Sequence, residues 1–333
     1  MKFKKILITG SDGFIGSHLV EYCIKMGINV RAFVFYNSFN SYGWLDHIDA
    51  KTKNKIDFFS GDIRNFDVVY QAAKGCDAIL HLAALVGIPY SYVSPENYID
   101  TNIVGTLNVL KVSRMQNIKK IILTSTSEVY GTAKYIPIDE IHPLNAQSPY
   151  ASTKIGADSL GLSFHKSFNM PVSILRPFNT YGPRQSARAV IPTIISQLLN
   201  NNSYVKLGNI NPTRDLNYVQ DVVRAFYLCL VRKESIGKII NVGSNYEISI
   251  KELAYLIAKI LNKKIVLHKD KIRQRPKNSE VERLYASNKL AKNILNWKPE
   301  YGGKKGLEKG LIETIDWFKK NNHYLYKSNN YNI

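Results

Sequence analysis

The residues most suited to chemistry are a tyrosine and a lysine four positions apart, in Ser148-Pro149-Tyr150-Ala151-Ser152-Thr153-Lys154. On a helix this spacing places both side chains on one face. A free tyrosine titrates near ~10 and is therefore a poor base at neutral pH. A lysine ammonium held nearby would stabilise the phenolate, so that Tyr150 could take a proton from a hydroxyl group. The alternative is an amphipathic helix with an exposed lysine and a half-buried tyrosine.

A second polar group follows the apolar run 120–124, in Ser125-Thr126-Ser127-Glu128-Val129-Tyr130-Gly131. We predict that the apolar run is a strand. Because ligands of open parallel sheets bind at the carboxyl ends of strands, this cluster is placed for chemistry. The alternative is a polar turn that caps the strand.

The N-terminal stretch has the pattern of an element that positions a cofactor. An apolar run from residue 5 to 9 leads into Gly10-Ser11-Asp12-Gly13-Phe14-Ile15-Gly16, followed by a predicted helix over 17–26 and a predicted strand over 28–35. Glycines let the backbone approach a pyrophosphate, which the helix N-terminus then stabilises. Strand, glycine turn, helix and strand together indicate dinucleotide binding rather than a chance glycine turn.

The end of that second strand lacks the acidic residue that commonly holds the adenosine ribose. It has the sequence Phe35-Tyr36-Asn37, in which Tyr36 or Asn37 could substitute by hydrogen bonding. No arginine follows to bind a 2′-phosphate, so this position does not choose between NAD and NADP.

Strands and helices keep alternating further along, which predicts an α/β fold with a doubly wound, Rossmann-like parallel sheet and a smaller C-terminal substrate domain. Predicted strands lie at 56–59, 77–81, 171–175, 213–219, 238–242 and 265–268, and predicted helices at 102–117, 189–199, 221–231, 249–261 and 307–320. We expect a dinucleotide-binding domain at 1–180 plus about 215–248, a substrate domain at 181–214 and 249–320, and a frayed tail at 321–333. Asp62, just past a strand, could accept from an adenine amino group or cap the next helix.

Composition indicates a globular protein. The 333 residues are 45% apolar and 21% charged, and no run of ~18 apolar residues suggests a membrane span. The N-terminal residues 1–5 lead into too short an apolar run for a signal peptide. Three widely spaced cysteines favour reduced thiols and a cytoplasmic location.

The net charge of +19 could indicate an anionic partner. The lysines are scattered, however, and no basic stretch carries the interleaved aromatic residues of a single-strand binder. We therefore expect no nucleic acid, membrane or metal partner, although a phosphorylated substrate would benefit from the positive field.

Four motifs together resemble the extended short-chain dehydrogenase/reductase family that acts on nucleotide sugars, over residues 4–320: the glycine turn, the polar strand end, Tyr150 with Lys154, and Arg176-Pro177-Phe178-Asn179. The resemblance implies NAD as the cofactor and a homodimer formed through helices at about 97–117 and 150–168. The implied cofactor-binding residues are Gly10, Gly13, Phe14, Ile15, Gly16, Asp62, Ile63, Leu82, Ala83, Ala84, Asn102, Tyr150, Lys154 and Pro177.

The resemblance also implies catalytic roles. Thr126 and Tyr150 contact the sugar 4-hydroxyl, and Lys154 contacts the nicotinamide ribose and lowers the pKa of the tyrosine. Tyr150 then removes the hydroxyl proton as hydride leaves carbon 4. The implied substrate-binding residues are Asn179, Arg188, Arg214 and Arg275, with the last two clamping the diphosphate unless they form surface ion pairs.

The dipeptide after Thr126 bears on the reaction. The dTDP-glucose dehydratases carry Asp-Glu there, epimerases carry small inert residues, and this chain has Ser127-Glu128. Glu128 matches the base that removes the carbon-5 proton, whereas Ser127 is a weak acid; Ser-Glu also occurs in UDP-glucuronate decarboxylases.

Longer stretches at 124–133, 176–193 and 213–221 resemble the retaining nucleotide-linked N-acetylglucosamine 4,6-dehydratases of legionaminic-acid-type surface-sugar pathways. We therefore expect a 4,6-dehydratase acting on a GDP- or UDP-linked sugar. The alternatives are a UDP-glucuronate decarboxylase, a 4-epimerase and a nicotinamide-binding sensor without catalysis.

Overall fold

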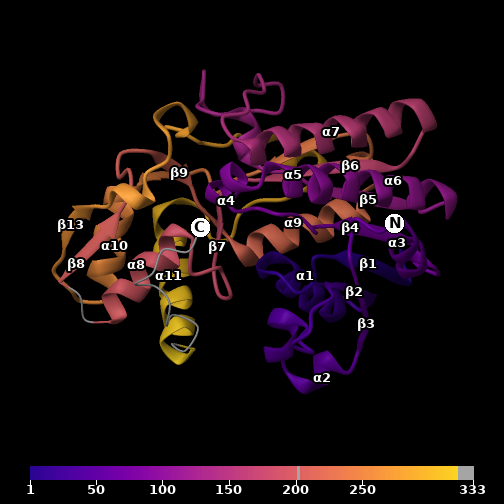
Figure 1. Ribbon diagram of the computed structural model, residues 1–333, viewed down its shortest axis with the longest axis horizontal. Helices are drawn as coiled ribbons and strands as arrows, with labels where there is room; N and C mark the ends of the chain where they lie inside the picture. Colours follow the sequence, from indigo (N-terminus) through magenta and orange to yellow (C-terminus); the bar gives the residue numbers. More distant parts are fainter. Residues whose placement is uncertain (201–202, 322–333) are drawn as a thin grey trace.

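A seven-stranded sheet, entirely parallel, dominates the computed structural model, which describes residues 1–200 and 203–321 (Figure 1). From edge to edge its order is β11-β6-β5-β4-β1-β2-β3. The strand order therefore reverses between β1 and β4, where open α/β sheets form a ligand crevice. The strands are β1 (Lys5–Thr9), β2 (Asn29–Phe35), β3 (Ile56–Gly61), β4 (Ala78–His81), β5 (Lys120–Thr124), β6 (Val172–Pro177) and β11 (Ile239–Val242).

Both faces of the sheet are buried, because successive strand residues point to opposite sides. Ile6 and Ile8 of β1 join one hydrophobic core, while Leu7 between them joins another. The first core is covered by α1 (Phe14–Lys25) and α9 (Val219–Val231). Helices α3 (Phe66–Ala73), α6 (Gly105–Met115) and α7 (Pro149–Phe168) cover the second. The predicted doubly wound sheet is confirmed.

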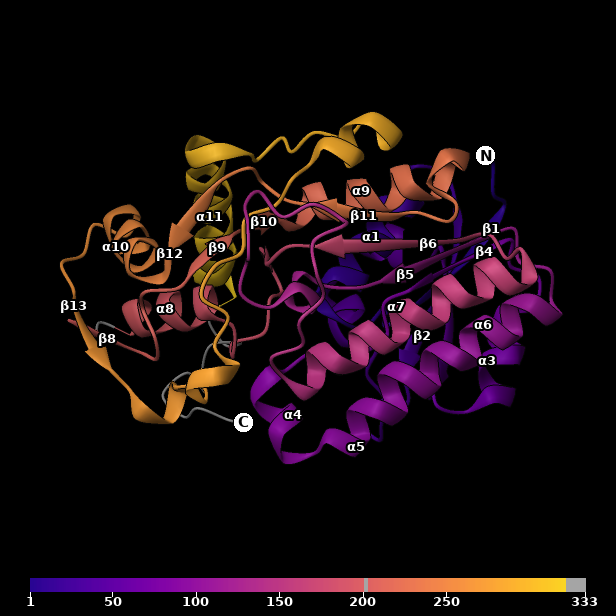
Figure 2. The same ribbon diagram turned by 90° about the horizontal axis from the view of Figure 1, so that it is seen from above.

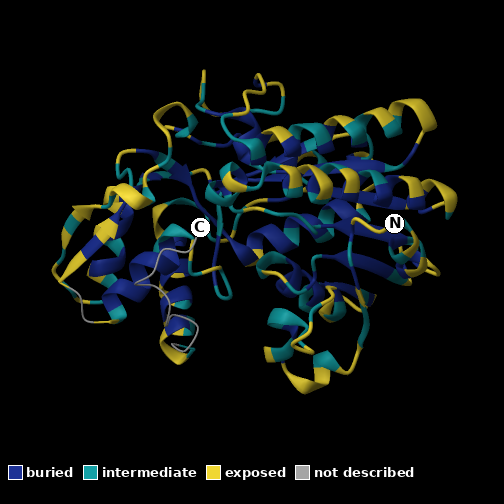
Figure 3. Ribbon diagram, in the orientation of Figure 1, coloured by how far each residue is buried: buried dark blue, intermediate teal, exposed yellow. Residues whose placement is uncertain are grey.

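A smaller lobe with its own hydrophobic core lies beside the carboxyl ends of the strands (Figures 1 and 2). Its helices are α8 (Val190–Leu199), α10 (Ile250–Ile260) and α11 (Gly303–Lys320), and Figure 3 shows their buried sides facing one another. Short strand pairs complete the lobe: β7 (Thr180–Tyr181) with β10 (Asn217–Tyr218), β8 (Tyr204–Leu207) with β13 (Val266–Lys269), and β9 (Thr213–Asp215) with β12 (Glu247–Ser249).

Several predicted boundaries were wrong for identifiable reasons. Helix α1 begins at Phe14, inside the glycine turn, because Gly13 is its N-cap. The single strand predicted at 213–219 is split, since β9 pairs with β12 and β10 pairs with β7. The helix predicted at 102–117 begins earlier, as α5 (Pro95–Tyr98) continues through a wider helical turn at Ile99–Val104 into α6. Short helices at α2 (Ala50–Lys53) and α4 (Ile88–Val93) were not predicted.

The predicted frayed tail falls almost entirely on residues 322–333, outside the described residues. The three cysteines, Cys23, Cys76 and Cys229, are buried and free. Within residues 1–200 and 203–321, no helix combines the length and apolar character that a bilayer crossing requires.

Candidate active site

A cavity of about 1040 Å³ is lined both by the carboxyl ends of the central strands and by the smaller lobe. All of the site residues predicted from the sequence line it, with the exception of Asn102. They are Gly10, Gly13, Phe14, Ile15, Gly16, Asp62, Ile63, Leu82, Ala83, Ala84, Thr126, Ser127, Glu128, Tyr150, Lys154, Pro177, Asn179, Arg188, Arg214 and Arg275.

The glycine turn is built for close approach of a ligand to the backbone. Gly10 has a φ of 68°, and a side chain there would lie 2.8 Å from the backbone nitrogen of Ala83. A side chain at Gly16 would lie 2.0 Å from the carbonyl oxygen of Gly10. Helix α1 begins at this turn, and no side chain caps its N-terminus. Its first backbone N–H groups therefore suit the pyrophosphate of a dinucleotide, so the residues present fit such a cofactor.

Asn102 does not line the cavity and lies behind its wall, so its predicted contact with the cofactor stays a prediction. It is 1% exposed, and its amide accepts from the backbone of Leu85 at 2.9 Å and donates back to it at 3.0 Å. It also donates to Thr153 of α7 at 3.0 Å. Asn102 therefore ties the loop after β4 to the helix that carries Tyr150 and Lys154.

Asp62 lies at the end of β3 and lines the cavity, but it does not cap the following helix. Asn65 caps α3 instead, accepting from the backbone of Val68 at 3.1 Å. The guanidinium of Arg64 binds the Asp62 carboxylate at 2.6 and 3.0 Å, and its hydrogen bonds lower the pKa of that carboxyl group. The capping alternative is thus wrong, whereas a contact with a ligand in the cavity stays a prediction.

Three polar groups meet where β5 ends beside the start of α7. Ser148 caps α7, accepting from the backbone of Ala151 at 3.1 Å, and Tyr150 occupies the first turn. Thr126 accepts from the backbone N–H of Glu128 at 3.2 Å and shares a hydrogen bond with Tyr150. Glu128 and Tyr150 are both 7% exposed. A phenol, a hydroxyl and a carboxylate thus share one buried corner of the cavity.

We predicted from the sequence that Lys154 would lower the pKa of Tyr150. In the structure the pKa of Tyr150 is raised instead. Burial raises that pKa, the hydrogen bond with Thr126 opposes the rise, and the negative charge of Glu128 adds to it. Burial also lowers the pKa of Lys154 to about 8, although Asp158 acts in the opposite direction. Burial is the largest cause of both shifts and favours the neutral form of each group, the phenol of Tyr150 and the amine of Lys154.

A buried ion pair behind the catalytic helix was missed in the sequence. Arg176 of β6 donates to Asp158 of α7 at 2.8 and 3.0 Å, and Ser125 donates to the same carboxylate at 2.7 Å. Arg176 also donates to the hydroxyl of Tyr130 at 2.9 Å. A signal existed: an arginine inside an apolar strand needs a buried partner, and Asp158 lies one turn beyond Lys154 on the same helix face.

Arg214 and Arg275 project into the cavity from the smaller lobe, where a glutamate lies between them. Glu280 is 3.3 Å from Arg214 and 3.8 Å from Arg275. Arg214 is only 7% exposed, and burial lowers its pKa. The alternative of a surface ion pair is therefore wrong for Arg214, whereas Arg275 is only half-buried. The Nη1 atom of Arg275 is buried and has no hydrogen-bond partner, so it could still bind an anion.

Two amide oxygens on the cavity wall are also buried without a hydrogen-bond partner: those of Asn179, which was predicted, and Gln185, which was not. Buried acceptors without partners are uncommon and suit ligand N–H or O–H groups. Arg188 lines the same cavity but is exposed.

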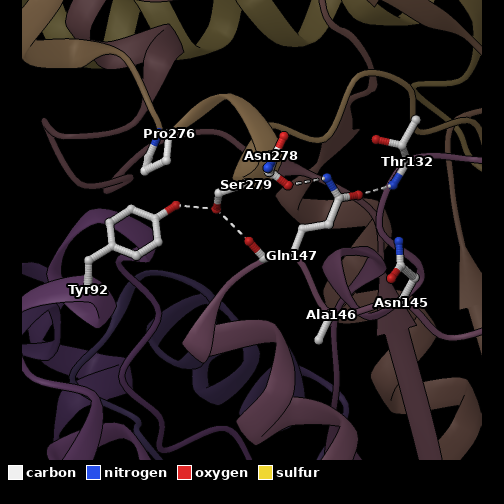
Figure 4. A pocket seen from close by; sticks show the side chains of 8 residues that line it. All are labelled: Tyr92, Thr132, Asn145, Ala146, Gln147, Pro276, Asn278 and Ser279. Carbon is white, nitrogen blue, oxygen red and sulfur yellow. Dashed lines mark hydrogen bonds between the residues drawn. The ribbon is translucent and has the colours of Figure 1, made fainter.

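Beside this cavity, a shallower hollow of about 680 Å³ contains a chain of hydrogen bonds (Figure 4). The hydroxyls of Tyr92 and Ser279 are 2.5 Å apart, and Ser279 donates to the carbonyl of Gln147 at 2.5 Å. The Gln147 amide donates to the carbonyls of Asn278 at 3.1 Å and Glu280 at 3.0 Å. We call residues 275–280 the arginine strap; these bonds tie it to the start of α7.

Comparisons with known proteins agree with this geometry. Residues 7–310 match the family described as GDP-mannose 4,6 dehydratase. A putative UDP-glucose 4-epimerase of Methanocaldococcus jannaschii is 33% identical, covering 95% of this chain and 99% of that protein. The human dTDP-D-glucose 4,6-dehydratase is 32% identical, covering 96% of this chain and 91% of that protein.

Among solved structures, UDP-glucuronic acid 4-epimerase from Bacillus cereus, in complex with UDP-glucuronic acid and NAD, matches with a TM-score of 0.85. It is 28% identical and the match covers 95% of this chain and 99% of that one. The chain therefore belongs to the extended short-chain dehydrogenase/reductase family of nucleotide-sugar 4,6-dehydratases and epimerases. The predicted cofactor, NAD, agrees with this structural neighbour.

Proposed function

We propose that this protein is an NAD-dependent 4,6-dehydratase that converts a GDP- or UDP-linked N-acetylglucosamine into its 4-keto-6-deoxy product. The observation that carries the proposal is the carboxylate of Glu128, buried beside Thr126 and Tyr150. An epimerase needs only the hydroxyl and the phenol at this corner, whereas elimination of water also needs a base for the carbon-5 proton.

The glycine turn and the uncapped start of α1 would hold the pyrophosphate of NAD, and the small residues after β4 would lie along it. When bound, NAD⁺ supplies a hydride acceptor and, once reduced, a hydride donor, so no second redox partner is needed. Thr9 fixes the loop after β4, since it accepts from the backbone of Leu82 and of Ala83 at 3.1 Å each.

In the first step, Tyr150 takes the proton of the sugar 4-hydroxyl, and Thr126 orients that hydroxyl. With its pKa near 8, Lys154 is mostly protonated at neutral pH, so its charge is available to stabilise the phenolate. The raised pKa of Tyr150 makes this stabilisation necessary, because desolvation alone favours the neutral phenol.

In the second step, Glu128 removes the carbon-5 proton, which the new 4-keto group has made acidic. The carbon-6 hydroxyl leaves as water, with its proton supplied through Ser127 or a water molecule. The hydride taken from carbon 4 would return from the bound cofactor to carbon 6, and Glu128 would return a proton to carbon 5. Ser127 is 1% exposed at the cavity wall, so it would act only on a group already enclosed there.

Substrate binding would use the smaller lobe. Arg214 and Arg275 would bind the diphosphate, with Asn179 and Arg188 as further contacts. Within the described residues, the Nη1 of Arg275 and the amide oxygen of Asn179 are buried without a hydrogen bond, although Nη1 lies 3.8 Å from Glu280. These atoms support the proposed roles, because a ligand would supply the missing hydrogen bonds.

The decisive experiment is NMR analysis of the products formed from GDP- and UDP-N-acetylglucosamine in D₂O. We expect a new 6-methyl signal and deuterium at carbon 5, with one nucleotide strongly preferred. The 4-epimer without loss of water would identify an epimerase, the activity in the names of two of the relatives above. Release of CO₂ from UDP-glucuronate, with both N-acetylglucosamine nucleotides inert, would identify a decarboxylase.

We also propose a homodimer formed through α5, α6 and α7, which lie side by side on one face (Figure 2). Exposed apolar side chains on this helical layer, including Ile99, Val104 and Phe168, support the proposal. Light scattering coupled to size exclusion would test it, and a monomer at micromolar concentration would contradict it.

A further inference from the structure

The cofactor site lacks the acid that usually ends the second strand, and the two predicted substitutes do not reach the cavity. Tyr36 is 70% exposed and is absent from the cavity wall. The Asn37 amide is engaged within its own loop, donating to Phe35 at 3.2 Å and to Ser41 at 2.8 Å and accepting from Phe39 at 3.0 Å. The ribose contact must therefore come from elsewhere.

Asp12, in the glycine turn, places a carboxylate at this point from the neighbouring strand. It lines the cavity, and its Oδ2 atom accepts from the backbone N–H of Phe35, the last residue of β2, at 3.4 Å. Although Asp12 follows β1 in sequence, its charge thus lies at the carboxyl end of β2. Rossmann folds commonly place their ribose-binding acid at that end.

The backbone around Asp12 is held by contacts that do not use its carboxylate. Its carbonyl accepts from Trp44 at 3.1 Å, and the preceding residue, Ser11, donates its backbone N–H to Phe33 at 3.2 Å. Gly43 has a φ of 61°, and a side chain there would lie 2.5 Å from the Asp12 carbonyl oxygen. The loop after β2 therefore packs against the turn and holds the backbone that carries the carboxylate.

Asp12 also differs from the two cavity acids that are paired with arginines, Asp62 and Glu280, and it lies apart from Glu128, which we place in the catalytic corner. Asp62 is bound by Arg64, and Glu280 lies between Arg214 and Arg275. Asp12 forms no ion pair within the described part of the chain, and burial raises the pKa of its carboxyl group. A half-buried carboxylate without a cation gains most from hydroxyl donors on a ligand.

We propose that Asp12 accepts hydrogen bonds from the adenosine ribose hydroxyls of NAD and that its charge disfavours the 2′-phosphate of NADP. This inference rests on the proposed use of NAD. It makes a residue inside the glycine turn the determinant of cofactor choice, in place of a residue after β2.

The test is isothermal titration calorimetry of NAD⁺ and NADP⁺ with protein stripped of nucleotide. We expect the wild type to prefer NAD⁺. Asp12→Asn, which keeps an acceptor for Phe35, should bind NAD⁺ about 10-fold more weakly and narrow the preference over NADP⁺. Asp12→Ala should bind NAD⁺ about 10- to 100-fold more weakly. Asn37→Ala and Tyr36→Phe are the matched controls and should change NAD⁺ affinity less than either.

Each outcome has a distinct meaning. Wild-type affinity for NAD⁺ in both Asp12 variants, or a larger loss in Asn37→Ala, would overturn the assignment of Asp12 while leaving the proposed function intact. A wild-type protein that binds neither dinucleotide would overturn both. Thermal melting of each variant separates a local loss of binding from unfolding; if Asp12→Asn does not fold, Asp12→Ala carries the comparison.

Discussion

The two walls of the cavity are built in different ways. The sheet-side wall consists of short consecutive stretches, such as the glycine turn at 10–16 and the strand end at 125–128, each placed by a central parallel strand. The lobe-side wall combines Arg214 of β9 with the arginine strap, which Gln147 holds from far away in the sequence. The residues that we propose for cofactor binding are thus encoded locally, whereas those that we propose for substrate binding are positioned by contacts between distant segments.

The largest effect is expected on the sheet-side wall, from Tyr150→Phe. Loss of the phenol removes the only base that we assign to the 4-hydroxyl, so kcat should fall roughly 10²- to 10⁴-fold. The control is Tyr135→Phe, which removes an exposed phenol that does not line the cavity. Single-turnover absorbance at 340 nm would measure hydride transfer, and a normal burst in Tyr150→Phe would contradict the assignment.

Glu128→Gln separates the two chemical steps on that same wall. It should still allow oxidation at carbon 4 but slow overall turnover about 10²-fold or more, because no base remains for the carbon-5 proton. NMR would follow exchange of that proton with D₂O, with the exposed Glu282→Gln as the control. Exchange at the wild-type rate in Glu128→Gln would show that Glu128 is not the base for the carbon-5 proton.

A separate variant, Ser127→Ala, tests the proton relay. Unchanged turnover in that variant would show that Ser127 does not supply the proton to the leaving hydroxyl.

Asp158→Asn tests whether the sheet-side wall depends on buried support. It would leave the Arg176 guanidinium buried without its anionic partner, so the free energy of unfolding should fall by about 3–5 kcal/mol. Urea denaturation would measure the change against the exposed Asp67→Asn. A loss below about 1 kcal/mol would show that Tyr130, which accepts from the guanidinium, supports Arg176 without the carboxylate.

The smallest effect is expected on the lobe-side wall, from Gln147→Ala. It removes the bonds to Asn278 and Glu280, so the strap should loosen and KM for the nucleotide sugar should rise about threefold to tenfold. Turnover should change less than twofold, since α7 keeps its own cap at Ser148. Asn145→Ala, in the same hollow, is the control. A fall in kcat as large as the rise in KM would contradict the proposal that the lobe-side wall contributes to substrate binding and not to catalysis.

The same distinction explains how much could be predicted from the sequence. The central strands and the residues at their carboxyl ends follow from local patterns, because a buried parallel strand is a continuous apolar run. Glu280 and Gln147 were missed because each acts on residues remote in sequence, and neither residue alone indicates its partner. Asp158 was missed although Arg176, an arginine in an apolar strand, indicated that a buried partner exists. The pKa of Tyr150 was predicted in the wrong direction because its burial, which raises that pKa, cannot be seen from the spacing of the two residues.

The position of Glu280 between Arg214 and Arg275 affects the binding of anionic ligands. The Glu280 carboxylate already neutralises part of the charge on Arg214 and Arg275. A diphosphate that binds to these arginines, as we propose, would therefore compete with an anion of the protein and would not enter a site of unbalanced positive charge. We therefore expect small phosphates to gain little free energy by binding at these arginines. The proposed enzyme should therefore be inhibited only weakly by the free phosphates of a cell.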